Sequence, residues 1–141
     1  MTDGILYSMK KHKKVILIAE DDSVIRELLT SMLTNAGYDL VTTTDGIEAV
    51  EAYKVYGNKV HLIITDIGMP RMNGLEAIAV IRKMSESVPI MILSIWEEAD
   101  YIKIAKQVGV KEYMKKPFDI QEFISNVRGI IPETPSEKSA A

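Results

Sequence analysis

Short runs of mainly apolar residues constrain the fold of this chain more than any other feature. The clearest lie within residues 15–19, 61–65 and 90–93, and polar or turn-forming residues bound each of them. Runs of this length suit one buried strand and are too short for a typical helix. Continuous apolar character also indicates strands covered on both faces, as in a parallel sheet. The second run delivers one carboxylate, Asp66, to its carboxyl end.

Segments with helical periodicity alternate with these strands. Apolar residues at positions 25, 28, 29, 32 and 33 share one face of a helix that Asp22 or Ser23 can cap and that Gly37 ends. Further helices are predicted over 47–56, from 74 onward, over 97–108 and from 119 to about 131, with strands over 38–43 and 111–115. Five strands alternating with five helices predict an α/β fold, a doubly wound five-stranded parallel sheet covered on both faces.

Polar side chains follow four of the predicted strands. Glu20 and Asp21 come after the first strand, Asp66 after the third, Ser94 after the fourth and Lys116 after the fifth. The carboxyl ends of parallel strands lie along one edge of the sheet, where α/β proteins place their binding sites. We therefore expect these five side chains to converge on one shallow pocket.

The residue types in this pocket indicate phosphoryl transfer assisted by a metal ion. Neighbouring carboxylates repel one another unless a cation neutralises them, and Mg²⁺ suits an oxygen-rich cluster that supplies one or two carboxylates. A carboxylate can also attack phosphorus and form an aspartyl-phosphate, which makes Asp66 the candidate acceptor. Lys116 can place an ammonium on a phosphoryl oxygen, and the Ser94 hydroxyl can donate to another.

Composition excludes several other classes. The chain contains no cysteine, which rules out disulfides and thiolate-bound metals. Its formal charge of -3 argues against nucleic acid binding. No apolar run approaches the roughly 20 residues that span a bilayer, so a cytoplasmic protein that contacts no membrane is expected. We expect one domain over 14–131, a flexible extension over 1–13, and a disordered tail or linker over 132–141.

The motifs together resemble the receiver domain of a two-component response regulator. They comprise Ile18-Ala19-Glu20-Asp21-Asp22, the segment from Asp66 to Gly74 (DIGMPRMNG), Ile92-Leu93-Ser94 and Lys116-Pro117-Phe118. The resemblance covers about residues 14–131, and each motif falls at the end of a predicted strand. It implies a flavodoxin-like fold with the strand order 2-1-3-4-5.

The resemblance also implies roles for the residues of the pocket. Asp66 is expected to accept a phosphoryl group from a histidine kinase, a phosphotransfer protein or a small acyl phosphate, and Lys116 to bind that group. Glu20, Asp21 and Asp66, with the backbone carbonyl of Gly68, are expected to hold Mg²⁺, Glu20 through water. Such a domain signals, and its only chemistry is its own phosphorylation and dephosphorylation.

A conformational switch is the second implication of the resemblance. Ser94 is expected to move toward the phosphoryl group while Tyr113 turns inward. Separately, the Lys116-Pro117 bond is expected to be cis. The surface formed by helix 97–108, strand 111–115 and helix 119–131 then changes. A downstream effector, an output domain or a second copy in a homodimer is expected to read it.

Two large residues depart from the family pattern. Where the family has Ala or Gly after the switch serine, this chain has Ile95, and Trp96 follows. We hypothesise that both restrict the access of small phosphodonors and of water to the pocket.

Three other functions compete with this interpretation. A phosphatase of the haloacid-dehalogenase type needs a second Asp where this chain has Gly68. A flavodoxin-like cofactor binder would place its phosphate against Glu20 and Asp21, which repel it. The third alternative is a receiver-like scaffold that is never phosphorylated.

Overall fold

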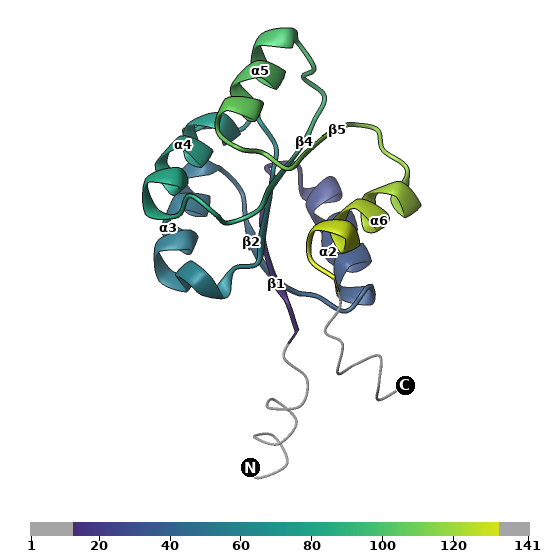
Figure 1. Ribbon diagram of the computed structural model, residues 1–141. Helices are drawn as coiled ribbons and strands as arrows, with labels where there is room; N and C mark the ends of the chain where they lie inside the picture. The colour runs from purple at the N-terminus through teal and green to yellow at the C-terminus, as the bar shows by residue number, and fades with distance from the viewer. Residues whose placement is uncertain (1–12, 133–141) are drawn as a thin grey trace.

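The computed structural model describes residues 13–132, and within that range the chain forms five strands and five α-helices (Figure 1). The elements are, in order, β1 (Val15–Ala19), α2 (Ser23–Asn35), β2 (Asp39–Thr43), α3 (Gly46–Tyr56), a 3-10 turn η1 (Gly57–Lys59), β3 (Leu62–Thr65), α4 (Gly74–Met84), β4 (Ile90–Ser94), α5 (Ala99–Gln107), β5 (Glu112–Lys115) and α6 (Ile120–Ile130). Apart from residues 13 and 132, the predicted extension and tail lie outside the described range. Between residues 13 and 132, no helix is long and apolar enough to cross a bilayer.

The strands form one parallel sheet in the order β2-β1-β3-β4-β5, which confirms the predicted fold. Ala19 at the end of β1 pairs with Thr65 of β3, and Thr65 pairs with Ile92 of β4. Ser94 at the end of β4 pairs with Lys115 of β5. The carboxyl ends of these four strands therefore lie along one edge of the sheet, as the sequence predicts.

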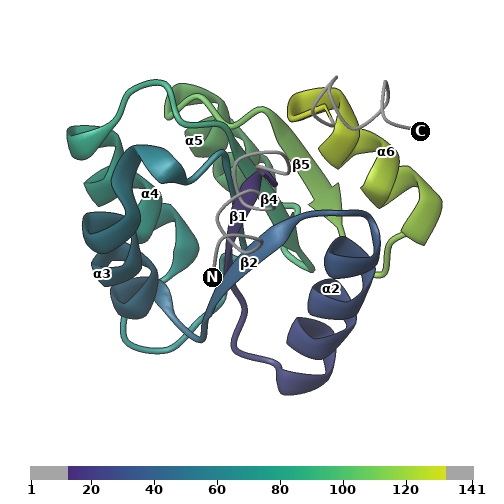
Figure 2. The same ribbon diagram turned by 90° about the horizontal axis from the view of Figure 1, so that it is seen from below.

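The core has two layers because successive residues of a strand face opposite sides of the sheet. On one side Ile16 and Ile18 pack in a cluster with residues of α2 and α6. On the other side Leu17 packs with residues of α3, α4 and α5. Figure 2 shows the two groups of helices on opposite faces of the sheet. Strands buried on both faces explain why the apolar runs of the sequence do not alternate with polar residues.

Element boundaries differ from the predicted ones by one or two residues, for identifiable reasons. Gly37 adopts a left-handed conformation with φ 102°, as predicted, and ends α2. The backbone N–H of Tyr38 donates to the carbonyl of Leu33, so β2 begins at Asp39 rather than at residue 38. The predicted helix over 97–108 begins only at Ala99, after Glu98 as its N-cap, and the side chain of Glu97 forms an ion pair with Lys115.

Two side-chain contacts fasten the edge of the sheet that lies away from the predicted site. Nδ1 of His61 accepts a hydrogen bond of 3.0 Å from the backbone N–H of Val15. Burial, followed by the charge of Lys14, lowers the pKa of His61. The guanidinium of Arg82 donates to the backbone carbonyls of residues 85, 88, 108 and 109, at 2.7 Å for Val88 and Val108. This guanidinium ties the end of α4 to the turn between α5 and β5.

Candidate functional site

The polar residues at the ends of four strands lie at the carboxyl edge of the sheet, as predicted, and Lys116 joins Glu20 to Asp66 there. Glu20, Asp66, Ser94 and Lys116 are all buried, with relative exposures between 0 and 9%. Buried polar groups are costly unless they find partners, so each contact of these side chains carries information. The described residues contain no buried side-chain polar atom without a hydrogen-bond partner.

Lys116 lies between two of the carboxylates. Its Nζ is 2.6 Å from Oε1 of Glu20 and 2.9 Å from Oδ2 of Asp66. Burial alone lowers the pKa of the Lys116 ammonium, but its hydrogen bonds to Glu20 and Asp66 outweigh burial and raise that pKa. The Lys116-Pro117 bond is cis, as predicted. The ammonium of Lys116 is therefore placed to contact the carboxylate of Asp66 and any group bonded to it.

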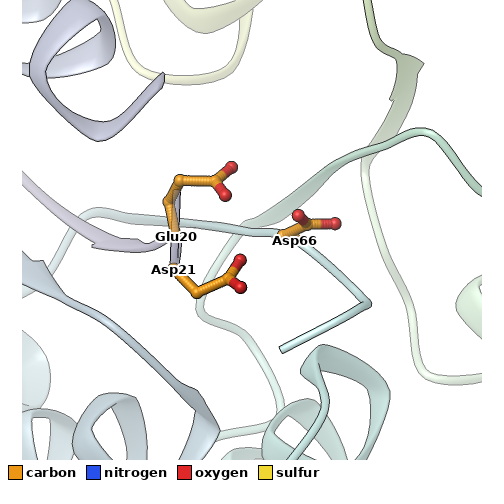
Figure 3. A group of neighbouring side chains, drawn as sticks. All are labelled: Glu20, Asp21 and Asp66. Carbon is orange, nitrogen blue, oxygen red and sulfur yellow. The ribbon is translucent and has the colours of Figure 1, made fainter. Parts of the chain in front are cut away.

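A third carboxylate completes an acidic cluster. Carboxylate oxygens of Glu20, Asp21 and Asp66 lie within 4.8 Å of one another. Figure 3 shows the side chains of Glu20 and Asp21 pointing toward the side on which Asp66 lies. Burial raises the pKa of Glu20, while the nearby Lys116 ammonium acts in the opposite direction. Three carboxylates and one ammonium leave the cluster with a formal charge of -2 when all are ionised. This negative charge and this set of hard oxygen atoms fit a divalent cation like Mg²⁺, whose bonds to oxygen are about 2.1 Å long.

Asp66 is held in place by its own backbone surroundings. Its Oδ1 accepts a 2.6 Å hydrogen bond from the backbone N–H of Ile67, which leaves Oδ2 to Lys116. A Cβ added to Gly74 would collide with the backbone carbonyl oxygen of Asp66. The amino end of α4, capped reciprocally by Asn73 and Glu76, therefore packs directly against the backbone of Asp66.

Gly68 lies beneath the indole ring of Trp96. A Cβ added to Gly68 would be 3.0 Å from Cζ2 of Trp96, which is tighter than ordinary packing. The Trp96 ring also packs on Tyr101, at 5.1 Å between ring centroids. Ile95, by contrast, is 65% exposed. Of the two residues predicted to restrict access, Trp96 is thus the one that covers part of the site.

The proposed switch residues both contact the backbone of Trp96. Oγ of Ser94 accepts a 3.1 Å hydrogen bond from the N–H of Trp96, and the Tyr113 hydroxyl donates to the carbonyl of Trp96. Burial, with the negative charges of Glu98 and Asp66, raises the pKa of Tyr113 and keeps its phenol protonated. The family resemblance implied Ser94 and Tyr113 as a pair, but it did not predict that the backbone N–H and carbonyl of Trp96 lie between them.

One ion pair near the site was missed by the sequence analysis. Asp45 follows β2 and is 5% exposed, and its Oδ2 lies 2.7 Å from both Nε and Nη2 of Arg71. An Asp before a Gly is a common turn signal, so nothing in the sequence singles Asp45 out. Asp22, in contrast, caps α2 by accepting from the N–H groups of Val24 and Ile25, which settles the predicted choice between Asp22 and Ser23.

Comparison with known proteins adds independent evidence. The family model described as the response regulator receiver domain matches residues 16–128. Response regulator MprA of Mycobacterium sp. (strain KMS) is 29% identical over 119 residues, which cover 84% of this chain and 51% of the relative. MprA of Mycobacterium leprae (strain TN) is 29% identical over 125 residues, which cover 89% and 54%. The chain spans about half the length of the curated relatives it matches.

Solved structures give the same picture. The non-phosphorylated HemR receiver domain from Leptospira biflexa superposes with a TM-score of 0.80 at 27% identity, covering 86% of this chain and 97% of the other. A chain of the CheX-CheY-BeF3-Mg²⁺ complex from Borrelia burgdorferi superposes with a TM-score of 0.79 at 25% identity, covering 83% and 88%.

Proposed function

Since this chain belongs to the response regulator receiver domain family, we propose that Asp66 is the residue on which it accepts a phosphoryl group. A receiver domain is a signalling domain of a two-component system and not a classical enzyme. We propose a histidine kinase or a phosphotransfer protein as the donor, with a small acyl phosphate as a chemical substitute. The domain itself we take as residues 14–131.

The contact between Lys116 and Asp66 carries this proposal. Phosphoryl transfer needs mainly positioning and neutralisation of charge, and an ammonium 2.9 Å from the acceptor carboxylate supplies both. An oxygen of Asp66 forms the new bond to phosphorus while the bond from phosphorus to the donor nitrogen breaks, and the electron pair stays on that nitrogen. As the transferred group arrives, Lys116 shifts one of its hydrogen bonds from the carboxylates to a phosphoryl oxygen.

Glu20, Asp21, Asp66 and the backbone carbonyl of Gly68 are the groups that would hold Mg²⁺. When bound, the ion supplies further neutralisation of the phosphoryl oxygens and orients the acceptor. The three carboxylates fit this role by their spacing and by the formal charge of the cluster. Trp96 packs on Gly68, so the indole ring also shields this side of the site from water.

The phosphoryl group carries about -1.5 to -2 charges in place of the single charge of the Asp66 carboxylate, and the hydroxyl of Ser94 can donate a hydrogen bond to one of its oxygens. Ser94 then releases the Trp96 N–H. Tyr113 gives up its hydrogen bond to the Trp96 carbonyl and turns inward. The surface formed by α5, β5 and α6 changes as these two backbone contacts of Trp96 change. We propose that an effector, an output domain or a second copy of the chain reads that surface, and relatives that this chain matches over only about half their length are consistent with an output domain.

The competing functions have less support. A hydrolase of the haloacid-dehalogenase type needs a second carboxylate at position 68, but this chain has Gly68 there, beneath the indole ring of Trp96. A scaffold that is never phosphorylated has no need for an ammonium buried between two carboxylates, an arrangement that is costly to maintain.

The test is the intact mass after incubation with acetyl phosphate and Mg²⁺, and in parallel with a phosphorylated histidine kinase. We expect a gain of one phosphoryl group in the wild type and none in Asp66→Asn. Asp22→Asn is the matched control, because it removes a carboxylate at the same edge while asparagine still caps α2. It should be phosphorylated like the wild type. A wild type that gains nothing from either donor would contradict the proposal and favour the scaffold alternative.

A further inference from the structure

The first turn of α3 supports the loop that follows Asp66. Arg71 in this loop forms its ion pair with Asp45, the residue that also caps α3 by accepting from the N–H of Glu48 at 2.8 Å. The side chain of Asp45 is only 7% exposed, whereas that of Arg71 is 55% exposed. The pair therefore joins a carboxylate fixed in the fold to a cation on a loop.

Two further contacts connect the same two segments. The N–H of Gly46 donates a 3.0 Å hydrogen bond to the carbonyl of Met72, and a Cβ on Gly46 would collide with that carbonyl oxygen. Met69 is buried in a cluster with Ala49 of α3 and Ala19 of β1. Asp45, Gly46 and Ala49 are the capping residue and two residues of the first turns of α3. Three anchors of the loop thus lie on one end of one helix.

The backbone of the loop shows that this support is needed. Arg71 has φ 65°, and among the described residues it is the single non-glycine residue with a positive φ. Such a conformation is uncommon for a residue with a side chain and persists when surrounding contacts over-determine it. Asp45 supplies a contact of this kind, since two nitrogens of the guanidinium meet one of its oxygens.

We propose that Asp45 and Arg71 are positioning residues that set the affinity of the acceptor site for a divalent cation. The inference rests on the proposed function, in which the Gly68 carbonyl is a metal ligand. A neutral carbonyl attracts a cation weakly, so it contributes only when its loop is already in place before binding. The ion pair keeps the loop from Gly68 to Met72 against α3, although neither Asp45 nor Arg71 is itself a metal ligand.

The test compares Mg²⁺ affinity among Asp45→Asn, Arg71→Asn and the double variant. Asparagine at 45 still caps a helix, and asparagine at 71 tolerates a positive φ, so each change removes the ion pair and spares the backbone. Trp96 is the only tryptophan of the chain, and its ring packs on Gly68, so its fluorescence reports the binding. Calorimetry gives the same dissociation constant independently, and thermal unfolding without Mg²⁺ gives the stability.

We expect each single variant to raise the Kd for Mg²⁺ about 3- to 10-fold, less than the 10- to 100-fold typical of groups that contact a metal ligand directly. The double variant should bind no more weakly than either single variant, because the two residues act as one unit. Lys54→Met is the control: it removes an exposed ion pair with Glu51 elsewhere on α3 and should leave the Kd unchanged.

The outcomes separate this inference from the proposed function. If the wild type binds Mg²⁺ and is phosphorylated while both single variants keep its Kd within twofold, the positioning role is wrong and the function stands. Lower thermal stability with an unchanged Kd would likewise reduce the pair to a structural contact. If the wild type itself binds no Mg²⁺, the proposed metal site fails first, whatever the variants do. Should Asp45→Asn not fold, Arg71→Asn alone decides.

Discussion

Replacing Lys116 by methionine removes one charge and keeps the length of the side chain, which makes it a sharp probe of the acidic cluster. In the wild type the ammonium contacts Glu20 and Asp66, both almost fully buried. Removing one partner of a buried ion pair typically costs about 3–5 kcal/mol, because the other charge is left unpaired. Here the cost has an upper limit, because Glu20 can take up a proton instead of staying charged.

The size of that limit depends on pH. Protonating a glutamate whose unshifted pKa is 4.5 costs about 3.4 kcal/mol at pH 7 and about 1.4 kcal/mol at pH 5.5. Burial already raises the pKa of Glu20, so the proton is accepted readily once the ammonium has gone. A carboxyl group with a raised pKa in the folded state loses stability as pH rises above its unfolded pKa. Lys116→Met should therefore lose about 3 kcal/mol at pH 7 and about 1 kcal/mol at pH 5.5.

Urea unfolding followed by circular dichroism measures both values. For an m value near 2 kcal/mol/M, we expect the midpoint to fall by about 1.5 M at pH 7 and by about 0.5 M at pH 5.5. Mg²⁺ can replace the missing charge, and at ten times its Kd it should add about 1.4 kcal/mol to the variant.

The neighbouring residue Lys115 gives a matched control. Its ion pair with Glu97 joins side chains that are both 56% exposed, so Lys115→Met should cost under about 0.5 kcal/mol at either pH. If Lys116→Met costs no more than this control, or if its cost is the same at both pH values, the ammonium does not neutralise Glu20 as argued.

Three further predictions concern residues away from Lys116. Trp96→Ala should accelerate dephosphorylation of the phosphorylated protein several-fold, measured by loss of phosphoryl mass over time. Ile95→Ala should not, since that side chain is 65% exposed. Equal rates in both variants and the wild type would contradict the shielding role. His61 accepts a backbone N–H and has a lowered pKa, so its contribution to stability is complete above pH 6.5 and is lost as pH falls from there toward the folded-state pKa. The difference in urea midpoint between the wild type and His61→Leu should accordingly shrink from pH 7.5 to pH 5.5, and a constant difference would speak against it. Arg82→Met should cost about 2 kcal/mol in urea unfolding, because partly buried carbonyls lose a charged donor. The matched change Lys83→Met, at an exposed neighbour, should cost less than about 0.5 kcal/mol.

The sheet and the centre of the site could be predicted because their signals are local or follow from topology. Apolar runs and helical periodicity identify the elements, and parallel strands bring their carboxyl ends to one edge. Ser94 ends a strand, and Glu20, Asp66 and Lys116 each follow one directly, so their placement at one edge needed no knowledge of loops. The strand order itself came from the family resemblance, because alternation alone leaves several orders open.

The contacts that were missed involve loops or backbone atoms. Asp45 and Arg71 are 26 residues apart on two loops, and no periodic pattern relates them. The acceptors of Arg82 are peptide carbonyls, which every residue carries and which no motif can mark. The carbonyl of Trp96 that receives the Tyr113 hydroxyl is hidden from the sequence in the same way.

The close approach of Gly46 and Gly74 to backbone carbonyls has a consequence for anyone who transplants this site. Loops are ordinarily the part of a fold that accepts mutation most readily, and both glycines lie where a loop enters a helix. Around Asp66 the opposite holds, because one added carbon at either glycine would strike the main chain. A graft that copies every charged side chain into another scaffold but not these two glycines would therefore rebuild the chemistry without its geometry. In a saturation mutagenesis experiment, two residues with no side chain should tolerate as little change as the acceptor itself.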